Sequence, residues 1–220
     1  MKFTLLTFFI IIGFRVQSIS CEKPKFYIIF EGFCVYSKKF ITDILAKDYT
    51  PILDDYIDII FIPFGKARQI RGSKMFHCQH GPDECQINKI MACALHFMEL
   101  NKKNQSSQVE LIGCMMSDPL KWMKCVRDMS FDKVDECSNS TLGQNLQIKN
   151  HKLQNKVVGG FPQGVPLVMV SYHPNDYESI KYTEVKKTIC EYVEPDLNDE
   201  LAIYCGIENG FANRGSSNFL

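Results

Sequence analysis

The chain has 220 residues, and its 25 basic and 25 acidic side chains give a formal net charge of zero. Hydrophobic residues make up 45% of the sequence and charged residues 23%, a balance typical of one globular domain with or without an insertion. Because there is no surplus of basic residues, the sequence gives no electrostatic reason to expect a nucleic-acid partner.

Residues 1–20 have the pattern of a secretory signal peptide. A lysine at the second position is followed by the apolar stretch Phe3–Phe14, which is too short to span a bilayer comfortably. Ser18 and Ser20 are small residues at the spacing required for cleavage before Cys21. We therefore predict that the signal peptide is removed, with an uncleaved anchor as the alternative. No later segment is long and apolar enough to predict a membrane span.

The sequence after the signal peptide is rich in cysteine and carries two glycosylation motifs. Its ten cysteines are Cys21, Cys34, Cys78, Cys85, Cys93, Cys114, Cys125, Cys137, Cys190 and Cys205. In an oxidising compartment such a set predicts mostly disulfides. The motifs at Asn104 (Asn-Gln-Ser) and Asn139 (Asn-Ser-Thr) predict N-glycosylation, in agreement with the secretory route.

A strand, a turn and a helix follow one another near the start of the mature chain. Phe26–Phe30 is a short apolar run that predicts a buried strand, and the residues from Phe40 to Leu45 repeat apolar side chains at one-turn spacing, which predicts a helix. Cys34 stands where this helix should begin, facing unpaired backbone N–H groups and the positive end of the helix dipole. Both features favour a reactive thiolate. A small buried cysteine that caps the helix is the alternative.

Two further strands complete the predicted sheet. Tyr56–Ile62 is nearly all apolar, so with the first strand and the helix it predicts a βαβ unit with a parallel pair. Leu167–Ser171 predicts a third strand, preceded by Val165-Pro166, a bond that can be cis. Tyr182–Tyr192 predicts a last helix.

The segment between the second and third strands predicts helices without a clear strand, over about residues 84–155. A turn at Gly81-Pro82 precedes it, with Asp83 as the expected N-cap. A zinc site is an alternative use of the cysteines and histidines in this region, which are His77, Cys78, His80, Cys85 and Cys93. Their spacing is not that of a Cys-x-x-Cys knuckle, and the secretory context favours disulfides, so no metal is predicted.

The motif Cys78-Gln-His-Gly-x-x-Glu-Cys85-x-x-Asn88-x-x-x-x-Cys93 resembles the signature of gamma-interferon-inducible lysosomal thiol reductases (GILT). Pro63-x-Gly-x-Ala67, Val165-Pro166 and the placement of the later cysteines also resemble that family. The resemblance covers about residues 25–205. It implies an α/β, disulfide-rich, thioredoxin-like fold with a helical insertion, and reduction of substrate disulfides in acidic compartments. By this resemblance Cys34 matches the attacking cysteine, and Pro166 the cis-proline that faces it.

The sequence pattern and the resemblance together give a domain plan. It consists of the signal peptide at 1–20, a thioredoxin-like GILT domain at 21–205 with its helical insertion at about 84–155, and a flexible tail at 206–220. Together with the signal peptide, the plan predicts a protein that is secreted or reaches the lysosomal lumen.

One departure from the family changes the expected mechanism. The family's reductases carry Cys-x-x-Cys, whereas this chain reads Cys34-Val35-Tyr36-Ser37, a variant that also occurs among the family's members. Val35 replaces a residue that is often proline. We therefore predict a thiol oxidoreductase that attacks protein disulfides with Cys34 alone, takes external small thiols as reductant and needs no cofactor. Ser37 is expected to hydrogen-bond the Cys34 thiolate. The alternative is a catalytically degenerate module that binds a protein partner.

The remaining cysteines are expected to be structural. The eight from Cys78 to Cys205 predict four bridges, and the sequence does not choose among their 105 pairings. Cys21 is left over, and it is free, capped by a small thiol or paired with another chain. The oligomeric state therefore stays open.

Overall fold

The computed structural model describes residues 22–126, 131–193 and 198–207. The predicted signal peptide, Cys21 and residues 208–220 of the predicted tail lie outside these residues, and the predicted domain boundaries stay predictions.

The centre of the molecule is a four-stranded sheet with strand order β2-β1-β5-β6. Its strands are β1 (Lys25–Phe30), β2 (Asp58–Pro63), β5 (Leu167–Ser171) and β6 (Glu178–Ile180). β1 and β2 are parallel, whereas β1–β5 and β5–β6 are antiparallel. The three predicted strands are confirmed. The sequence did not indicate β6, because a three-residue edge strand with two polar residues leaves no apolar pattern.

A helical segment joins β1 to β2 and confirms the predicted βαβ unit. It begins as α1 (Val35–Phe40), passes through the π-helical turn η1 (Ile41–Leu45) and ends as α2 (Ala46–Asp48), before the short 3₁₀ helix η2 (Pro51–Asp55). Thr50, which precedes a proline, is extended, and this explains why the helix stops there.

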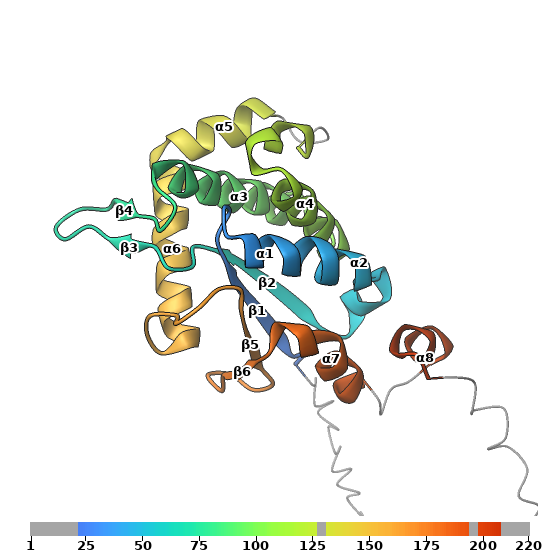
Figure 1. The fold of residues 1–220 in the computed structure, drawn as a ribbon. Coiled ribbons are helices and arrows are strands. Elements are labelled where there is room, and N and C mark those ends of the chain that lie inside the picture. The colour runs from blue at the N-terminus through green and yellow to red at the C-terminus, as the bar shows by residue number, and fades with distance from the viewer. Residues whose placement is uncertain (1–21, 127–130, 194–197, 208–220) are drawn as a thin grey trace, which may run out of the picture.

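Helices also fill the chain between β2 and β5. They are α3 (Pro82–Leu100), α4 (Gln105–Ser117), the 3₁₀ helix η3 (Pro119–Lys124), α5 (Phe131–Asn139) and α6 (Thr141–Val158). Before them stands a two-stranded hairpin of β3 (Arg68–Gln69) and β4 (Phe76–His77), which projects from the body in Figure 1. These two strands are too short and polar to be recognised from the sequence. The N-cap of α3 is Gly81 rather than Asp83, which lies in the first turn behind Pro82.

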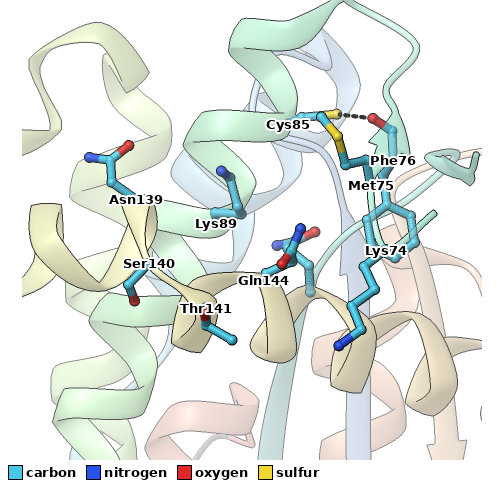
Figure 2. A pocket seen from close by; sticks show the side chains of 10 residues that line it. Lys74, Met75, Phe76, Cys85, Lys89, Asn139, Ser140, Thr141 and Gln144 are labelled. Carbon is cyan, nitrogen blue, oxygen red and sulfur yellow. Dashed lines mark hydrogen bonds between the residues drawn. The ribbon is translucent and has the colours of Figure 1, made fainter.

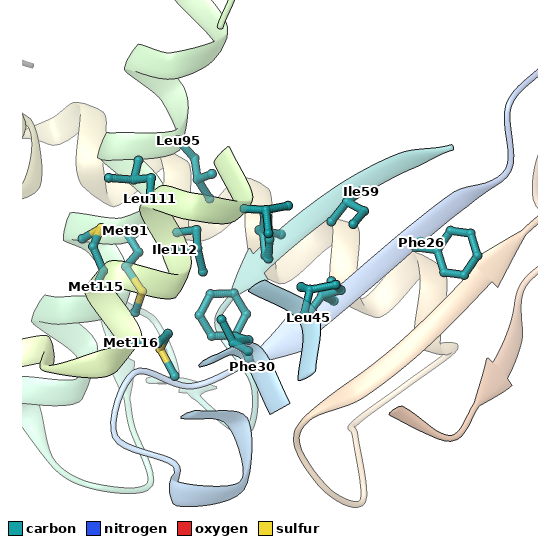
Figure 3. Close-up of a cluster of buried hydrophobic side chains, with 14 of the residues drawn as sticks. Phe26, Phe30, Leu45, Ile59, Met91, Leu95, Leu111, Ile112, Met115 and Met116 are labelled. Atoms are coloured by element: carbon teal, nitrogen blue, oxygen red, sulfur yellow. The ribbon is translucent and has the colours of Figure 1, made fainter. Parts of the chain in front are cut away.

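The two faces of the sheet have separate apolar cores because alternate residues of a strand point to opposite sides. Phe26, Ile28 and Phe30 join the larger core, which α1, α3, α4 and α7 (Val185–Val193) cover (Figure 3). Tyr27 and Ile29 join the smaller one, which α6 covers. β1 is therefore buried on both sides, as its continuous apolar sequence indicated.

Within the described residues, four disulfides fasten helices to one another or to the loops beside them. The pairs are Cys78–Cys85, Cys93–Cys137, Cys114–Cys125 and Cys190–Cys205. They account for the eight cysteines expected to be structural. The last pair joins α7 to α8 (Asp199–Cys205), a helix that the sequence analysis did not predict. Within the described part of the chain, no helix combines the length and apolarity that a membrane crossing requires.

The disulfides predict unequal losses of stability. Cys93–Cys137 spans 44 positions and encloses Cys114–Cys125, which spans 11. Loop-closure entropy grows with the logarithm of loop length, so replacing the first pair with alanines should cost ~1 kcal/mol more than replacing the second. Each loss should lie within ~2–4 kcal/mol. Urea denaturation followed by circular dichroism measures both values, and equal losses would contradict the entropic explanation.

Candidate active site around Cys34

Cys34 lies at the start of the helical segment that follows β1. Its backbone N–H donates to the carbonyl of Glu31 at 3.3 Å, which closes a turn, and its carbonyl accepts from Lys38 N at 2.9 Å. The residue is the N-cap of α1, so the backbone N–H groups of the first helical turn point toward it. Its side chain is only 6% exposed.

The Cys34 thiol meets a loop from the far end of the sequence. Its Sγ donates a hydrogen bond to the carbonyl oxygen of Val165 at 3.6 Å, and the Val165–Pro166 peptide bond is cis. Strand pairing explains this meeting, because Ile29 near the end of β1 pairs with Leu167 at the start of β5. The residues that follow β1 and the residues that precede β5 therefore lie at the same end of the sheet. A carbonyl only accepts, so this bond uses the proton of the thiol.

Ser37 makes no hydrogen bond to the Cys34 thiol in this structure. Its side chain is fully buried, and its Oγ has no hydrogen-bond partner. Ser37 shares the buried face of α1 with Phe40, one turn further along, whereas the Cys34 sulfur is turned toward Val165. The hydrogen bond from Ser37 to the Cys34 thiolate therefore stays a prediction.

The two residues between Cys34 and Ser37 face solvent. Val35 is 74% exposed and Tyr36 is 69% exposed. Because both side chains are apolar or aromatic, they form an exposed apolar rim directly beside the thiol. Such a rim suits contact with apolar segments of another chain.

The carboxyl group of Glu31 lies buried behind the turn that Cys34 closes. Glu31 is fully buried, and its Oε1 accepts from the backbone N–H of Lys66. Burial raises the pKa of Glu31, the hydrogen bond from Lys66 lowers it, and the nearby Glu84 raises it further. Gly65 has a positive φ of 62° and packs so closely that a Cβ there would come within 2.3 Å of Glu31 Cγ. The Pro63-x-Gly-x-Ala67 motif therefore packs against the carboxyl group of Glu31.

The polar residues of the long signature motif also converge on this turn. Glu84 is fully buried, and its two carboxylate oxygens contact the backbone N–H and Nδ1 of His80. Asn88, also fully buried, accepts from Gly32 N through Oδ1 at 2.9 Å. From the sequence, His80 was considered only as an alternative zinc ligand, and Glu31 was not singled out. The four-residue spacing of positions 80, 84 and 88 was the available signal for a shared face.

The cysteines considered for zinc are paired in disulfides and are not thiolate ligands. Cys78 and Cys85 bond to each other, and Cys93 bonds to Cys137. In the part of the chain that the structure describes, Cys34 is the one free cysteine.

A cavity of about 330 Å³ lies between α3, the start of α6 and β4, and Cys34 is not among its lining residues (Figure 2). Lys74 and Lys89 are the charged residues of its lining, and burial lowers the pKa of Lys89. Asn139 stands at its rim and is exposed. Asn104 is exposed too and caps α4, with its Oδ1 accepting from Ser107 N at 3.2 Å. Both predicted glycosylation sites are therefore open to solvent, and glycosylation itself stays a prediction.

Comparison with known proteins matches this chain to one family. Residues 25–129 match the model of the gamma interferon inducible lysosomal thiol reductase family. An Arabidopsis thaliana gamma-interferon-responsive lysosomal thiol protein is 31% identical over 163 residues, which are 74% of this chain and 67% of the relative. GILT-like protein 1 of Drosophila melanogaster is 30% identical over 144 residues, which are 58% of each chain.

A solved structure supports the fold. The crystal structure of a candidate protein disulfide isomerase from Nitrosomonas europaea superimposes with a TM-score of 0.51 at 9% identity. The match covers 80% of this chain and all of that one. At this identity the likeness concerns the fold alone, and it confirms the prediction of a thioredoxin-like α/β fold.

The close approach of α3 to the turn predicts that Gly32 tolerates no side chain. A Cβ at Gly32 would lie 2.4 Å from Ile87 Cγ2 and 3.0 Å from Met91 Cε, both fully packed. Gly32→Ala should therefore lower the free energy of unfolding by about 1–3 kcal/mol. Gly164→Ala is the matched control, because nothing lies within 4 Å of a Cβ there. It should change stability by less than about 0.5 kcal/mol. Thermal unfolding of both variants measures these changes. Equal stability of the Gly32→Ala and Gly164→Ala variants would show that α3 leaves room for a side chain at Gly32.

Proposed function

Because the chain belongs to the gamma-interferon-inducible lysosomal thiol reductase family, we propose that it is a thiol-disulfide oxidoreductase that acts on protein disulfides through Cys34 alone. One observation carries this proposal. The Cys34 thiol lies at the N-cap of α1 and contacts the carbonyl oxygen of Val165, beside the cis peptide bond to Pro166. A free sulfur at a helix start is suited to nucleophilic attack, because the thiolate is the reactive form and the helix start stabilises negative charge.

The proposed reaction uses two external thiols for each substrate disulfide. The Cys34 thiolate attacks one sulfur of the substrate disulfide, forms a mixed disulfide and releases the other sulfur as a thiolate, which takes up a proton. A first external thiolate then attacks the Cys34 sulfur and frees the second substrate thiol. The first external thiol is now bound to Cys34 as a mixed disulfide. A second external thiolate attacks its sulfur, which releases the Cys34 thiolate and a small disulfide made of both external thiols. Electrons therefore come from small thiols, and the proposed reaction requires no other cofactor.

Ser37 is the reason for proposing external resolution of the mixed disulfide. It has no sulfur, so it cannot resolve the mixed disulfide from within the site, as the second cysteine of a Cys-x-x-Cys pair does at high effective molarity. When the substrate's own second cysteine attacks instead, the net result is isomerisation without electron transfer. Protein disulfide substrates and small thiols are the partners that this chemistry requires.

The surroundings of Cys34 fit a protein substrate in a disulfide-permissive compartment. The exposed side chains of Val35 and Tyr36 offer apolar contact to a chain segment that carries the target disulfide. Four disulfides within the described residues fit a secreted or lysosomal protein, which agrees with the predicted signal peptide.

A second function, binding a protein partner without redox turnover, has its own supporting observations. The Cys34 thiol is 6% exposed and its proton is engaged by Val165, while Ser37 replaces the second cysteine of the family's reductases. In this case the apolar rim remains as a docking surface, and the thiol is inert. Turnover of a disulfide substrate with excess small thiol separates the two functions.

The proposed mechanism predicts long-lived mixed disulfides. We expect the protein to trap a peptide disulfide when no external thiol is present, because nothing in the site resolves the intermediate. Ser37→Cys should shorten the lifetime of the trapped species by orders of magnitude, since an intramolecular thiol then competes with solution thiols. Mass spectrometry of acid-quenched samples, followed over time at acidic and neutral pH, measures this lifetime.

All variants in this experiment should carry Cys21→Ser, so that the signal reports on Cys34. Cys34→Ser is the control and should trap nothing. Negligible trapping by the parent and by both variants, at both pH values, would rule out the enzymatic proposal and leave the binding function.

A further inference from the structure

A cluster of two carboxylates and an imidazole lies behind the turn that carries Cys34. Glu31 and Glu84 are fully buried, and the side chain of His80 is 35% exposed. One ligand atom from each of the three residues lies within 4.8 Å of the other two. Buried carboxylates that face each other require a compensating positive charge or a proton, because burial strongly penalises an unpaired charge.

Three of the four carboxylate oxygens in this cluster have partners. Glu31 Oε1 accepts from Lys66 N, while the two oxygens of Glu84 contact His80 N and His80 Nδ1. The fourth, Glu31 Oε2, is buried without a hydrogen bond, and it faces His80 Nδ1 at 3.6 Å. A buried oxygen that points into a cluster of ligand groups and has no partner indicates that a further species belongs there.

We propose that Glu31, His80 and Glu84 bind a divalent cation of the zinc type through Glu31 Oε2, His80 Nδ1 and Glu84 Oε2. A divalent charge balances both carboxylates, whereas a protonated His80 would balance only one. An imidazole nitrogen with two carboxylate oxygens is a donor set that suits zinc, and the nitrogen disfavours calcium and magnesium, which prefer oxygen alone.

The chain holds these ligands in place before any ion arrives. His80 and Glu84 both lie inside the loop that the Cys78–Cys85 disulfide closes, which fixes their separation. The Gln79 side-chain amide lies next to the second ring nitrogen, with its Nε2 3.3 Å from His80 Nε2. With a cation on Nδ1 the ring proton sits on Nε2, so the Gln79 amide has to turn its oxygen toward Nε2 to accept that proton. Glu31 is held from the other side by the backbone of Lys66.

The proposed site is independent of the redox chemistry of Cys34, although it adjoins the same turn. The backbone carbonyl of Glu31 accepts from Cys34 N. A cation bound to the side-chain carboxylate of Glu31 would therefore hold the residue that begins this turn. Metal ligands must be deprotonated, so zinc binding should be strong at neutral pH and should be lost in acid.

Zinc binding to the full-length protein tests the proposal. The protein should carry Cys21→Ser and Cys34→Ser, which removes thiols that would bind zinc themselves, and should be purified without a metal-affinity tag and treated with a chelator. Titration calorimetry at pH 7.5 should give one zinc ion per chain and no uptake of Ca²⁺. The same titration at pH 4.5 should show no zinc binding.

Two histidines of the same region provide a matched pair of variants. His80→Ala should weaken zinc binding by at least about 100-fold, the upper range for losing even an outer-shell partner. His77→Ala, an exposed residue outside the cluster, should bind zinc as the parent does. Because His80 is partly exposed, the His80→Ala variant should fold. Glu31→Gln tests a second ligand, provided that its circular dichroism spectrum is native, and it should also weaken zinc binding. Absence of zinc binding at pH 7.5, or equal binding by both histidine variants, would overturn the site and leave a shared proton as the compensating species.

Discussion

The pairing of β1 with strands on both of its sides determines where the functional residues meet. β2 lies parallel to β1, and β5 lies antiparallel to it. Because of the antiparallel pairing, the last residues of β1 and the first residues of β5 lie at the same end of the sheet. At that end a tight turn connects β1 to Cys34, and Val165-Pro166 directly precedes β5. The apolar faces of β1 hold this register, because a shift of one residue would move every core side chain to the wrong face.

The helix α3 gives the turn its shape. Gly32 approaches α3 without a side chain, and Asn88 accepts its N–H, so the backbone of the turn is fixed in position. Glu84 faces the Glu31 carboxyl from the start of the same helix, and His80 faces it from the turn that precedes that helix. The signature motif thus combines two roles. Its cysteines close disulfides, while its polar residues support the segment that presents Cys34.

Much of this organisation could be predicted from the sequence, because it depends on local patterns. The apolar runs predicted β1, β2 and β5, and the turn residues together with apolar spacing predicted the helix after Cys34. β6, the β3–β4 hairpin and α8 were missed, since such short elements owe their form to tertiary contacts and, in α8, to a disulfide. The unpartnered state of Ser37 was also beyond reach, because it depends on which face of α1 turns to the core. Glu31 and Glu84 lie 53 positions apart, and only the fold brings them together.

The proposed function requires that Cys34, although only 6% exposed, reacts as a nucleophile in the folded protein. Alkylation of the native protein without reductant, followed by peptide mapping, tests it most directly. We expect Cys34 to be labelled in the native state while the eight cysteines from Cys78 to Cys205 stay unlabelled. Labelling of Cys34 only after denaturation would contradict the account, because the thiol would then be inert in the folded protein.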